Sequence, residues 1–285
     1  MKIAVIGPGG IGSTFAFQLA RVGHDVTIVA RGKRLEQLQR DQAVIISDGQ
    51  RAVVRVTAVL DETTPWELVL VTVLASQVDA LLPALRASAA RQVMFMFNTF
   101  EPLGRLRDAV GAARFAFGFP AILASVDGGK LTTQIVAHGP LVTTVTDADW
   151  ARAFTEAGIA SVVSSDMQSW LRTHAAFVVP MMVLAHRAYQ RKAGISWREA
   201  RTFAAAMREG FALVRRLGDI VTPPAMTVVE RLPAAALTAL LWTTSRVPAI
   251  RKSGAAGPGE PRSLIDAMRT AAHGELPALL AIRPD

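Results

Sequence analysis

A glycine-rich segment close to the N-terminus has the spacing of a phosphate-binding loop. It reads Gly7-Pro8-Gly9-Gly10-Ile11-Gly12 and matches the pattern G-x-G-x-x-G. An apolar, strand-like segment over residues 2–6 precedes it, and residues 11–22 follow with apolar side chains at helical spacing. In that setting the glycines allow a tight turn, close approach of the backbone to a pyrophosphate, and contact between helix and strand, while the helix N-terminus faces the anion. We therefore predict that these six residues bind the pyrophosphate of a dinucleotide; an ordinary glycine-rich turn is the alternative.

The end of the second expected strand, residues 25–30, indicates which dinucleotide binds. A site that prefers NAD carries Asp or Glu there, whose carboxylate accepts a hydrogen bond from the ribose 2′-hydroxyl. This chain has Arg31 instead, followed by Lys33 and Arg34. A carboxylate would repel a 2′-phosphate, whereas a guanidinium binds it through two parallel hydrogen bonds. We predict NADP(H) as the cofactor, with Arg31 and Arg34 as contacts; a solvated basic loop is the alternative, and FAD is less favoured.

The elements that must position these residues alternate between strand and helix as far as residue 165. Strands are expected at 2–6, 25–30, 68–73, 93–97 and 115–119, a hairpin of 43–46 with 51–59, a helix at 76–90, and further strands of the sheet at 131–136, 141–144 and 160–163. After residue 166 the pattern is helical, with long helices at 167–191, bent or interrupted near Pro180, and at 197–217. The sequence therefore predicts an α/β fold: an N-terminal Rossmann NADP-binding domain over residues 1–165, followed by an all-helical domain for substrate binding and dimerisation over 166–285.

Composition and charge exclude several classes of protein. The 285 residues include no cysteine, which excludes a disulfide scaffold, a cysteine-zinc site, an iron–sulfur centre and a thiol nucleophile. The longest unbroken apolar stretch, residues 175–185, is shorter than the roughly 20 residues of a membrane span, and the N-terminus does not resemble a signal peptide, so we expect a cytoplasmic protein without membrane contact. The formal charge is +8, but the basic residues are scattered, so no nucleic-acid partner is expected. The histidines show no metal-ligand spacing with carboxylates, so no metal is expected.

Six segments carry a family resemblance. They are MKIAVIGPGGIGS at the start, VARGKR around Arg31, LVLVTVLASQVDALLPAL at 68–85, MFNTFEPLG around Asn98, GFP and DGGKL within 118–131, and SWLRTHAAFVVP at 169–180. Together they resemble the ketopantoate reductase (2-dehydropantoate 2-reductase) family over nearly the whole chain. The resemblance implies a Rossmann domain, then a helical domain, with the site between them. It also implies NADPH-dependent reduction of a carbonyl group in a small-molecule substrate by hydride transfer.

The resemblance also implies residue roles. The glycine loop would hold the pyrophosphate, and Arg31 the 2′-phosphate. The remaining cofactor positions are Gln77, which matches a family glutamine near the cofactor, Asn98, which matches the asparagine beside the nicotinamide and substrate, Ala124, at a cofactor-contact position, and Glu260, which matches a glutamate near the nicotinamide ribose.

The chain departs from the family at positions that carry chemistry. Leu74 stands where the family has a lysine near the reacting carbonyl, and Arg172 where it has the general-acid lysine. Ala176 and Pro180 replace asparagines that bind ketopantoate in the family. Because lost polar contacts weaken recognition of a polar substrate, we expect a 2-keto acid or a less polar ketone or imine as substrate, and no efficient turnover of ketopantoate itself.

Arg172, His174 and Asn98 are the candidate catalytic residues. Arg172 suits stabilisation of charge on the carbonyl oxygen, but an arginine keeps its proton in proteins and is a poor proton donor. His174, with an ordinary pKa of about 6.5, is the substitute donor. The two positions are about 200° apart on an ideal helix, so both face one substrate only if the helix is distorted. A structural ion pair for Arg172 and a packed core position for His174 are the alternatives. Asn98 orients the carbonyl or the nicotinamide amide, unless it only forms a turn.

The sequence favours two classes of function over a third, a nucleic-acid-associated regulator on a Rossmann scaffold. The first is the NADPH-dependent reductase. The second is a non-catalytic NADP(H)-binding sensor or regulatory protein on the same fold, which the missing lysines favour. Both need the glycine loop and Arg31, so these residues do not separate them. The apolar helical domain, with Met181 and Met182, also favours a homodimer.

Overall fold

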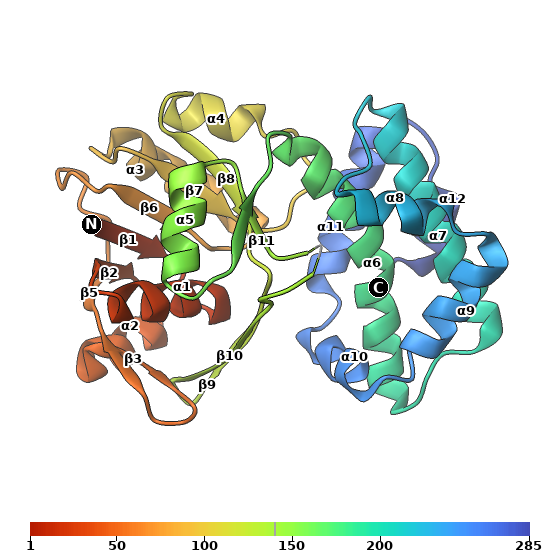
Figure 1. Cartoon of the computed structure of the whole chain (residues 1–285), viewed down its shortest axis with the longest axis horizontal. Coiled ribbons are helices and arrows are strands. Elements are labelled where there is room, and N and C mark those ends of the chain that lie inside the picture. The colour runs from red at the N-terminus through yellow and green to blue at the C-terminus, as the bar shows by residue number, and fades with distance from the viewer. Residues whose placement is uncertain (140) are drawn as a thin grey trace. The chain divides into compact units, whose positions relative to one another are not determined.

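The computed structural model of the chain describes residues 1–139 and 141–285, which form two compact units. The α/β unit contains Met1–Phe97 and Leu103–Met167, and the helical unit contains Asn98–Pro102 and Gln168–Asp285. A short segment of the N-terminal half, residues 98–102, therefore packs with the C-terminal helices. Figure 1 shows strands and helices alternating in the α/β unit, and helices in the other.

The strands of the α/β unit belong to two sheets. They are β1 (Lys2–Ile6), β2 (Asp25–Val29), β3 (Ala43–Ile46), β4 (Arg51–Val53), β5 (Arg55–Thr57), β6 (Leu68–Val71), β7 (Val93–Met96), β8 (Phe115–Phe119), β9 (Ile122–Asp127), β10 (Lys130–Ile135), β11 (Thr143–Val145) and β12 (Ser161–Val163). The helices between them are α1 (Gly10–Arg21), α2 (Gly32–Asp41), α3 (Leu82–Ala87), α4 (Gly104–Val110) and α5 (Ala148–Glu156).

The larger sheet has the strand order of a Rossmann fold. Within the described residues it contains eight strands in the order β12-β11-β8-β7-β6-β1-β2-β5, and those from β8 to β5 are parallel. β1 lies between β2 and β6, with Ile6 paired to Val29 on one side and to Val71 on the other. Ligands of such sheets bind beyond the carboxyl ends of the strands, where the strand order reverses. The predicted fold class is confirmed, and the reversal falls at the end of β1.

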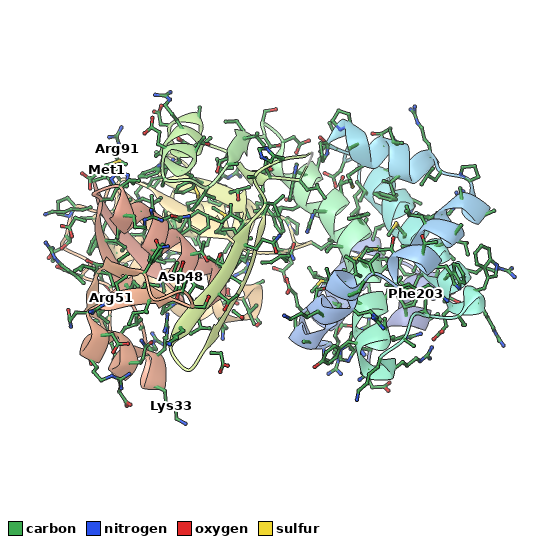
Figure 2. All side chains as sticks on the ribbon, turned by 60° about the horizontal axis from the view of Figure 1, so that its bottom comes forward. Met1, Lys33, Asp48, Arg51, Arg91 and Phe203 are labelled. Carbon is green, nitrogen blue, oxygen red and sulfur yellow. The ribbon has the colours of Figure 1, made fainter. Side chains whose placement is uncertain are left out.

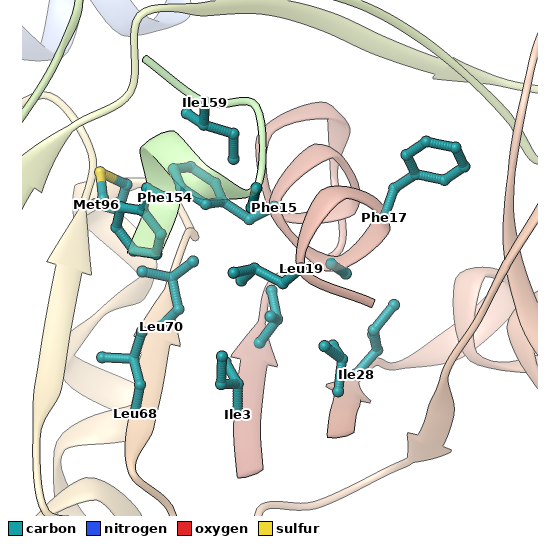
Figure 3. Packing of buried hydrophobic residues seen from close by; sticks show 14 of the residues in the cluster. Ile3, Phe15, Phe17, Leu19, Ile28, Leu68, Leu70, Met96, Phe154 and Ile159 are labelled. Atoms are coloured by element: carbon teal, nitrogen blue, oxygen red, sulfur yellow. The ribbon is translucent and has the colours of Figure 1, made fainter. Parts of the chain in front are cut away.

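The sheet forms because its central strands carry continuous apolar runs. All residues of β6 and β7 are buried, as parallel strands covered on both faces require. Helix α1 packs Phe15 and Leu19 over this sheet, and Leu19 lies close to Ile3 and Ile28 (Figure 3). Phe154 from α5 meets Phe15 edge-on, with ring centroids 5.0 Å apart. This packing holds the N-terminal end of α1 directly after β1.

Two strand predictions differ from the structure, one in the sheet that the residues join and one in the extent of the strand. Residues 131–136 were expected to extend the main sheet, but β10 belongs to a second sheet with the order β4-β3-β10-β9. It pairs with β9 across a tight turn at Gly128 and Gly129, both with positive φ, a conformation that glycine adopts without strain. The expected strand at 51–59 is interrupted after Val53: β4 pairs with β3 in the second sheet, and β5 pairs with β2 in the main one.

The predicted helix at 76–90 was also wrong in its extent. The chain instead forms two 3-10 turns, Ala75–Gln77 and Asp79–Leu81, before the short helix α3. Pro83 lies in the first turn of α3. Proline fits there because it has no N–H to donate, but it would break the interior of a longer helix. The α-helix therefore begins only at Leu82.

The helical unit is built around two long helices. Its elements are α6 (Met167–Arg191), α7 (Trp197–Arg216), α8 (Pro224–Arg231), α9 (Ala234–Thr244), α10 (Pro248–Ser253), α11 (Gly259–Ala272) and α12 (Pro277–Ile282). α6 continues through Pro180, and α7 begins with a capping box between Ser196 and Glu199. Among the described residues no single helix is long and apolar enough to cross a membrane; α8 and α9 meet that criterion only as a pair, bent by 110°.

Candidate functional site

The glycine loop is tightly packed on its protein side. Gly7 has φ +92°, and a Cβ there would lie 2.7 Å from Val73 Cγ1. A Cβ on Gly12 would lie 2.4 Å from both the Gly7 carbonyl oxygen and the Thr72 hydroxyl. That hydroxyl donates to the Gly7 carbonyl oxygen at 2.8 Å, which ties the loop to the strand end of β6. Only glycine fits at these two positions, because the loop, β6 and the start of α1 are in direct contact.

The other face of the loop is open. A Cβ on Gly9 would meet no atom of the described residues, 1–139 and 141–285, within 4 Å. Gly10, the next residue, packs against Ala124 of β9, whose carbonyl oxygen would lie 2.4 Å from an added Cβ. The structure therefore places Ala124 against the loop, as one of the walls that hold it. Gly9 is the position where a ligand can reach the backbone.

The start of α1 favours an anion. Gly9 is the N-cap and has no side chain to satisfy the first N–H groups of the helix, which lack partners within it. The first turn carries no acidic residue. The positive end of the helix dipole is therefore not neutralised, and it points toward the open side of the loop.

Arg34 holds the glycine loop in place through hydrogen bonds within the protein. Its Nε donates to the Pro8 carbonyl oxygen at 3.1 Å, and its Nη2 donates to the Ser13 hydroxyl at 2.8 Å. Nη1 reaches the Gly129 carbonyl oxygen at 3.3 Å and also contacts Gln37. Burial lowers the pKa of Arg34. Most of its donors are thus directed at the protein, so its main observed role is to connect the loop, α1 and the β9–β10 turn.

Arg31 and Lys33 lie at the beginning of α2 and are exposed. Arg31 is the N-cap of that helix and follows β2 after one residue. Since Val29 of β2 pairs with Ile6 of β1, the strand ends that carry Arg31 and the glycine loop are neighbours. Lys33 extends away from the protein into solvent (Figure 2). Of the basic residues in this segment, Arg31 and Lys33 have side chains that a ligand can reach.

Leu74 and Gln77 follow β6 at the same edge of the sheet. Leu74 is 56% exposed. The Gln77 side-chain oxygen accepts a hydrogen bond from the Leu74 N–H at 3.2 Å, so it caps the 3-10 turn. Because β6 is parallel to β1, these residues lie at the carboxyl edge that carries the glycine loop.

Within the helical unit the structure joins Asn98 to Glu260. The Asn98 amide Nδ2 donates to Glu260 Oε1 at 2.8 Å, across 162 residues of sequence. Glu260 lies in the first turn of α11. The amide oxygen of Asn98 is buried and has no hydrogen-bond partner among the residues that the structure describes. A buried acceptor without a donor is costly, so a ligand N–H or O–H fits this position.

Arg172 forms a buried ion pair. Its Nη1 lies 2.6 Å from Asp219 Oδ2, and its Nε donates to the Phe100 carbonyl oxygen at 3.2 Å. The guanidinium carbon also lies 5.4 Å from the centre of the Phe100 ring. The sequence did not indicate Asp219, which is 47 positions further along the chain and belongs to no local motif.

His174 is packed into the helical unit. Its ring stacks on Trp170 with centroids 5.1 Å apart and an angle of 7° between the planes. Burial lowers the pKa of His174 to about 3. The imidazole is therefore neutral at pH 7, and it has no surplus proton to give to a substrate.

The departure from the family at Ala176 has a packing explanation. Ala176 is fully buried, and a Cβ added to Gly210 of α7 would lie 3.1 Å from the Ala176 Cα and Cβ. The two helices therefore meet closely at small residues, which leaves no space for a longer side chain at 176. A cavity of about 630 Å³ lies nearby in the same unit, with Arg172, Ser263 and Thr270 among its lining residues. Among the described residues no three potential metal ligands come together.

The strand order and the glycine loop together define the Rossmann dinucleotide-binding class of fold. The chain belongs to the ketopantoate reductase PanE/ApbA family, whose model matches residues 3–149. This confirms the resemblance inferred from the sequence.

Two curated relatives agree with this assignment over part of their length. Over 88 residues the chain is 40% identical to the 2-dehydropantoate 2-reductase of Mesorhizobium japonicum, covering 30% of this chain and 26% of the relative. Over 143 residues it is 30% identical to the 2-dehydropantoate 2-reductase of Vibrio cholerae, covering 48% of this chain and 44% of the relative. The chain thus spans less than half the length of the curated relatives it matches.

Solved structures share the fold over almost the whole chain. The 2-dehydropantoate 2-reductase of Methylococcus capsulatus superposes with a TM-score of 0.71 at 18% identity, covering 99% of this chain and 94% of that one. A D-mandelate dehydrogenase in ternary complex with NADH and anilino(oxo)acetate superposes with a TM-score of 0.72 at 13% identity, covering 99% and 96%. At these identities the likeness shows a common fold.

Proposed function

We propose that the protein is an NADPH-dependent reductase that transfers a hydride to the carbonyl carbon of a small-molecule substrate, either a 2-keto acid or a less polar ketone or imine. The observation that carries the proposal is the glycine loop, which is closed against the protein at Gly7 and Gly12 and open at Gly9. Membership of the ketopantoate reductase family supports the same reaction class.

The residues present fit a nicotinamide dinucleotide. The free N–H groups at the start of α1 would receive the pyrophosphate over Gly9, and the exposed Arg31 would bind a 2′-phosphate. The buried, unpartnered oxygen of Asn98 would accept from the nicotinamide amide or a ribose hydroxyl, with Glu260 beside it as a second acceptor. NADPH supplies the hydride when bound.

The cofactor preference has a direct test. Because Arg31 would meet the 2′-phosphate with a charge-assisted pair, NADPH should bind at least about tenfold more tightly than NADH, a difference of about 1.4 kcal/mol. Arg31→Ala should remove most of that preference while NADH binding stays the same. Lys33→Ala, which removes a neighbouring charge of the same sign, is the matched control. Equal affinities of the wild-type protein for the two cofactors would refute the assignment.

A non-catalytic NADP(H) sensor is the second candidate, and three observations favour it. Leu74 is exposed where the family has a lysine, Arg172 is neutralised by Asp219, and burial keeps the pKa of His174 at about 3. NADPH oxidation should be followed with a panel of 2-keto acids, ketones and imines. Turnover of any of them supports the reductase. Tight NADPH binding with no turnover across the panel supports the sensor instead.

We also propose that two copies associate through the helical unit. That unit exposes several large apolar side chains, with Tyr189 and Trp197 each 48% exposed and Leu240 44% exposed. Light scattering at micromolar concentration tests this, and a monomer mass over the whole range would refute it.

A further inference from the structure

We propose that Arg172 is a positioning residue: paired with Asp219, its guanidinium holds residues 98–102 in place and so determines where the Asn98 amide lies. The inference rests on the proposed function, in which Asn98 contacts the cofactor or substrate. It goes further because it assigns to the residue at the family's general-acid position a role that involves no proton transfer.

Arg172 contacts Phe100, in the middle of residues 98–102, and its ion-pair partner Asp219. Nε donates to the Phe100 carbonyl oxygen at 3.2 Å, and the guanidinium lies over the Phe100 ring at 5.4 Å. Phe100 itself is fully buried. The Arg172 side chain thus contacts both the backbone carbonyl and the ring of Phe100.

Asp219 keeps the guanidinium in that orientation. Its Oδ2 lies 2.6 Å from Arg172 Nη1, and its Oδ1 accepts from the Ser169 hydroxyl at 3.4 Å. The side chains of the pair are only 10% and 12% exposed. A buried pair with directional hydrogen bonds cannot reorient toward a substrate without leaving a buried carboxylate unpaired, which is strongly unfavourable.

By holding Phe100, Arg172 also restrains the position of Asn98, because the segment is short. Asn98 and Phe100 are two residues apart, so their Cα atoms are separated by no more than about 7 Å. Asn98 is held at its side chain by Glu260, and the Gln168 amide donates to the Glu101 carbonyl oxygen at 3.3 Å. Arg172 therefore anchors the middle of a segment whose first residue carries the functional amide.

A double-mutant cycle on Arg172 and Asp219 tests the role kinetically. If the two act as one anchor, Arg172→Gln and Asp219→Asn should each lower kcat by up to about 10²-fold, since a displacement of about 1 Å in an active site has this effect. The double variant should be no worse than the poorer single one, and the Kd for NADPH should rise by about the same factor in all three variants, because each displaces the same Asn98 amide. If Asp219→Asn leaves kcat unchanged or raises it, the guanidinium acts on the substrate and the proposal is overturned.

Arg172→Lys separates anchoring from proton donation. Lysine keeps the charge next to Asp219 but loses the planar fork that also reaches Phe100. We expect partial recovery of kcat relative to Arg172→Gln, with the pH profile of the wild type. A new ionisation in the pH profile of this variant, accompanied by a kcat above that of the wild type, would mean that the position serves proton transfer.

Hydrogen exchange gives a readout that does not depend on turnover. In Arg172→Gln and Asp219→Asn the amides of residues 98–102 should exchange faster than in the wild type, and Arg172→Lys should lie between them. The glycine loop at 7–12 should be unaffected, which also verifies that the variants fold. Unchanged exchange at 98–102 overturns the proposal even if the enzyme is active. Faster exchange there, in a protein that neither binds nor oxidises NADPH, supports the anchor and rejects the proposed function.

Discussion

Replacement of Gly9 by alanine separates cofactor binding from folding. In the described part of the chain, a Cβ at this position meets no atom within 4 Å, and the backbone, with φ −69° and ψ −161°, is extended. Where the native backbone suits alanine, Gly→Ala substitutions stabilise a protein by about 0.4–1 kcal/mol, because the unfolded chain loses freedom. We therefore expect Gly9→Ala to leave the Tm unchanged or to raise it slightly.

The same methyl group should obstruct the ligand. It projects into the open side of the loop, where a pyrophosphate has to reach the first N–H groups of α1. A hydrogen bond to a charged group contributes about 1.5–3 kcal/mol. Loss of one such bond corresponds to NADPH binding that is about ten- to a hundredfold weaker.

Two further glycines make the measurement decisive. Gly104, the first residue of α4, also has no described atom within 4 Å of an added Cβ, so Gly104→Ala should likewise leave the Tm unchanged or raise it slightly, but should keep the Kd for NADPH. Gly12→Ala should instead destabilise the fold by about 1–3 kcal/mol, because its Cβ would lie 2.4 Å from backbone and side-chain oxygens. Thermal melts and titrations that follow NADPH fluorescence measure both quantities. If Gly9→Ala binds NADPH as tightly as the wild type, the loop is not the pyrophosphate site.

Three other predictions follow from single contacts. Arg34→Lys, which loses the fork that braces the loop, should weaken NADPH and NADH binding by the same factor in calorimetric titrations; a loss confined to NADPH would place Arg34 at the 2′-phosphate. Because the pKa of His174 falls from 6.5 to about 3 on folding, the unfolded chain takes up its proton first as the pH drops, so stability should decline by up to about 1.4 kcal/mol per pH unit from pH 6.5 to about 3. Urea melts of His174→Gln should lack this component, and identical slopes in both proteins would contradict it. Phe15→Ala, which removes a fully buried ring between α1 and the sheet, should cost about 3–5 kcal/mol in denaturant unfolding, and a loss below about 1 kcal/mol would mean that the ring is not part of the core.

Features that depend on neighbouring residues could be predicted from the sequence. Apolar runs such as Leu68–Val71 identify buried parallel strands, and the spacing of the glycines after β1 identifies the turn into α1. These patterns follow from backbone sterics and from which face of an element is buried, so they are visible within a window of ten residues. The fold class was predictable for this reason.

The partners of those elements were less predictable. The strand at 130–135 was recognised as a strand, but its sheet depends on pairing with β9 through the turn at Gly128 and Gly129. The short helix α3 begins next to Pro83, which fits the first turn of a helix but would break the longer helix that the apolar pattern of residues 76–90 suggests. The side-chain pattern of a strand is visible in its own residues, whereas the strand with which it pairs is decided by the rest of the chain.

By itself, the sequence determined the class of fold, the family, and which residue types are missing from the family's chemical positions. Only the tertiary structure decided which residues these positions contact. It paired Arg172 with Asp219 across 47 residues and Asn98 with Glu260 across 162. It also directed Arg34, an expected contact of the cofactor, at the Pro8 carbonyl oxygen of the glycine loop. The physical reason is that a charged or polar side chain on a helix can reach solvent, ligand or protein from the same sequence position. Its partner is set by which distant segments fold against it, and local sequence carries no record of that choice.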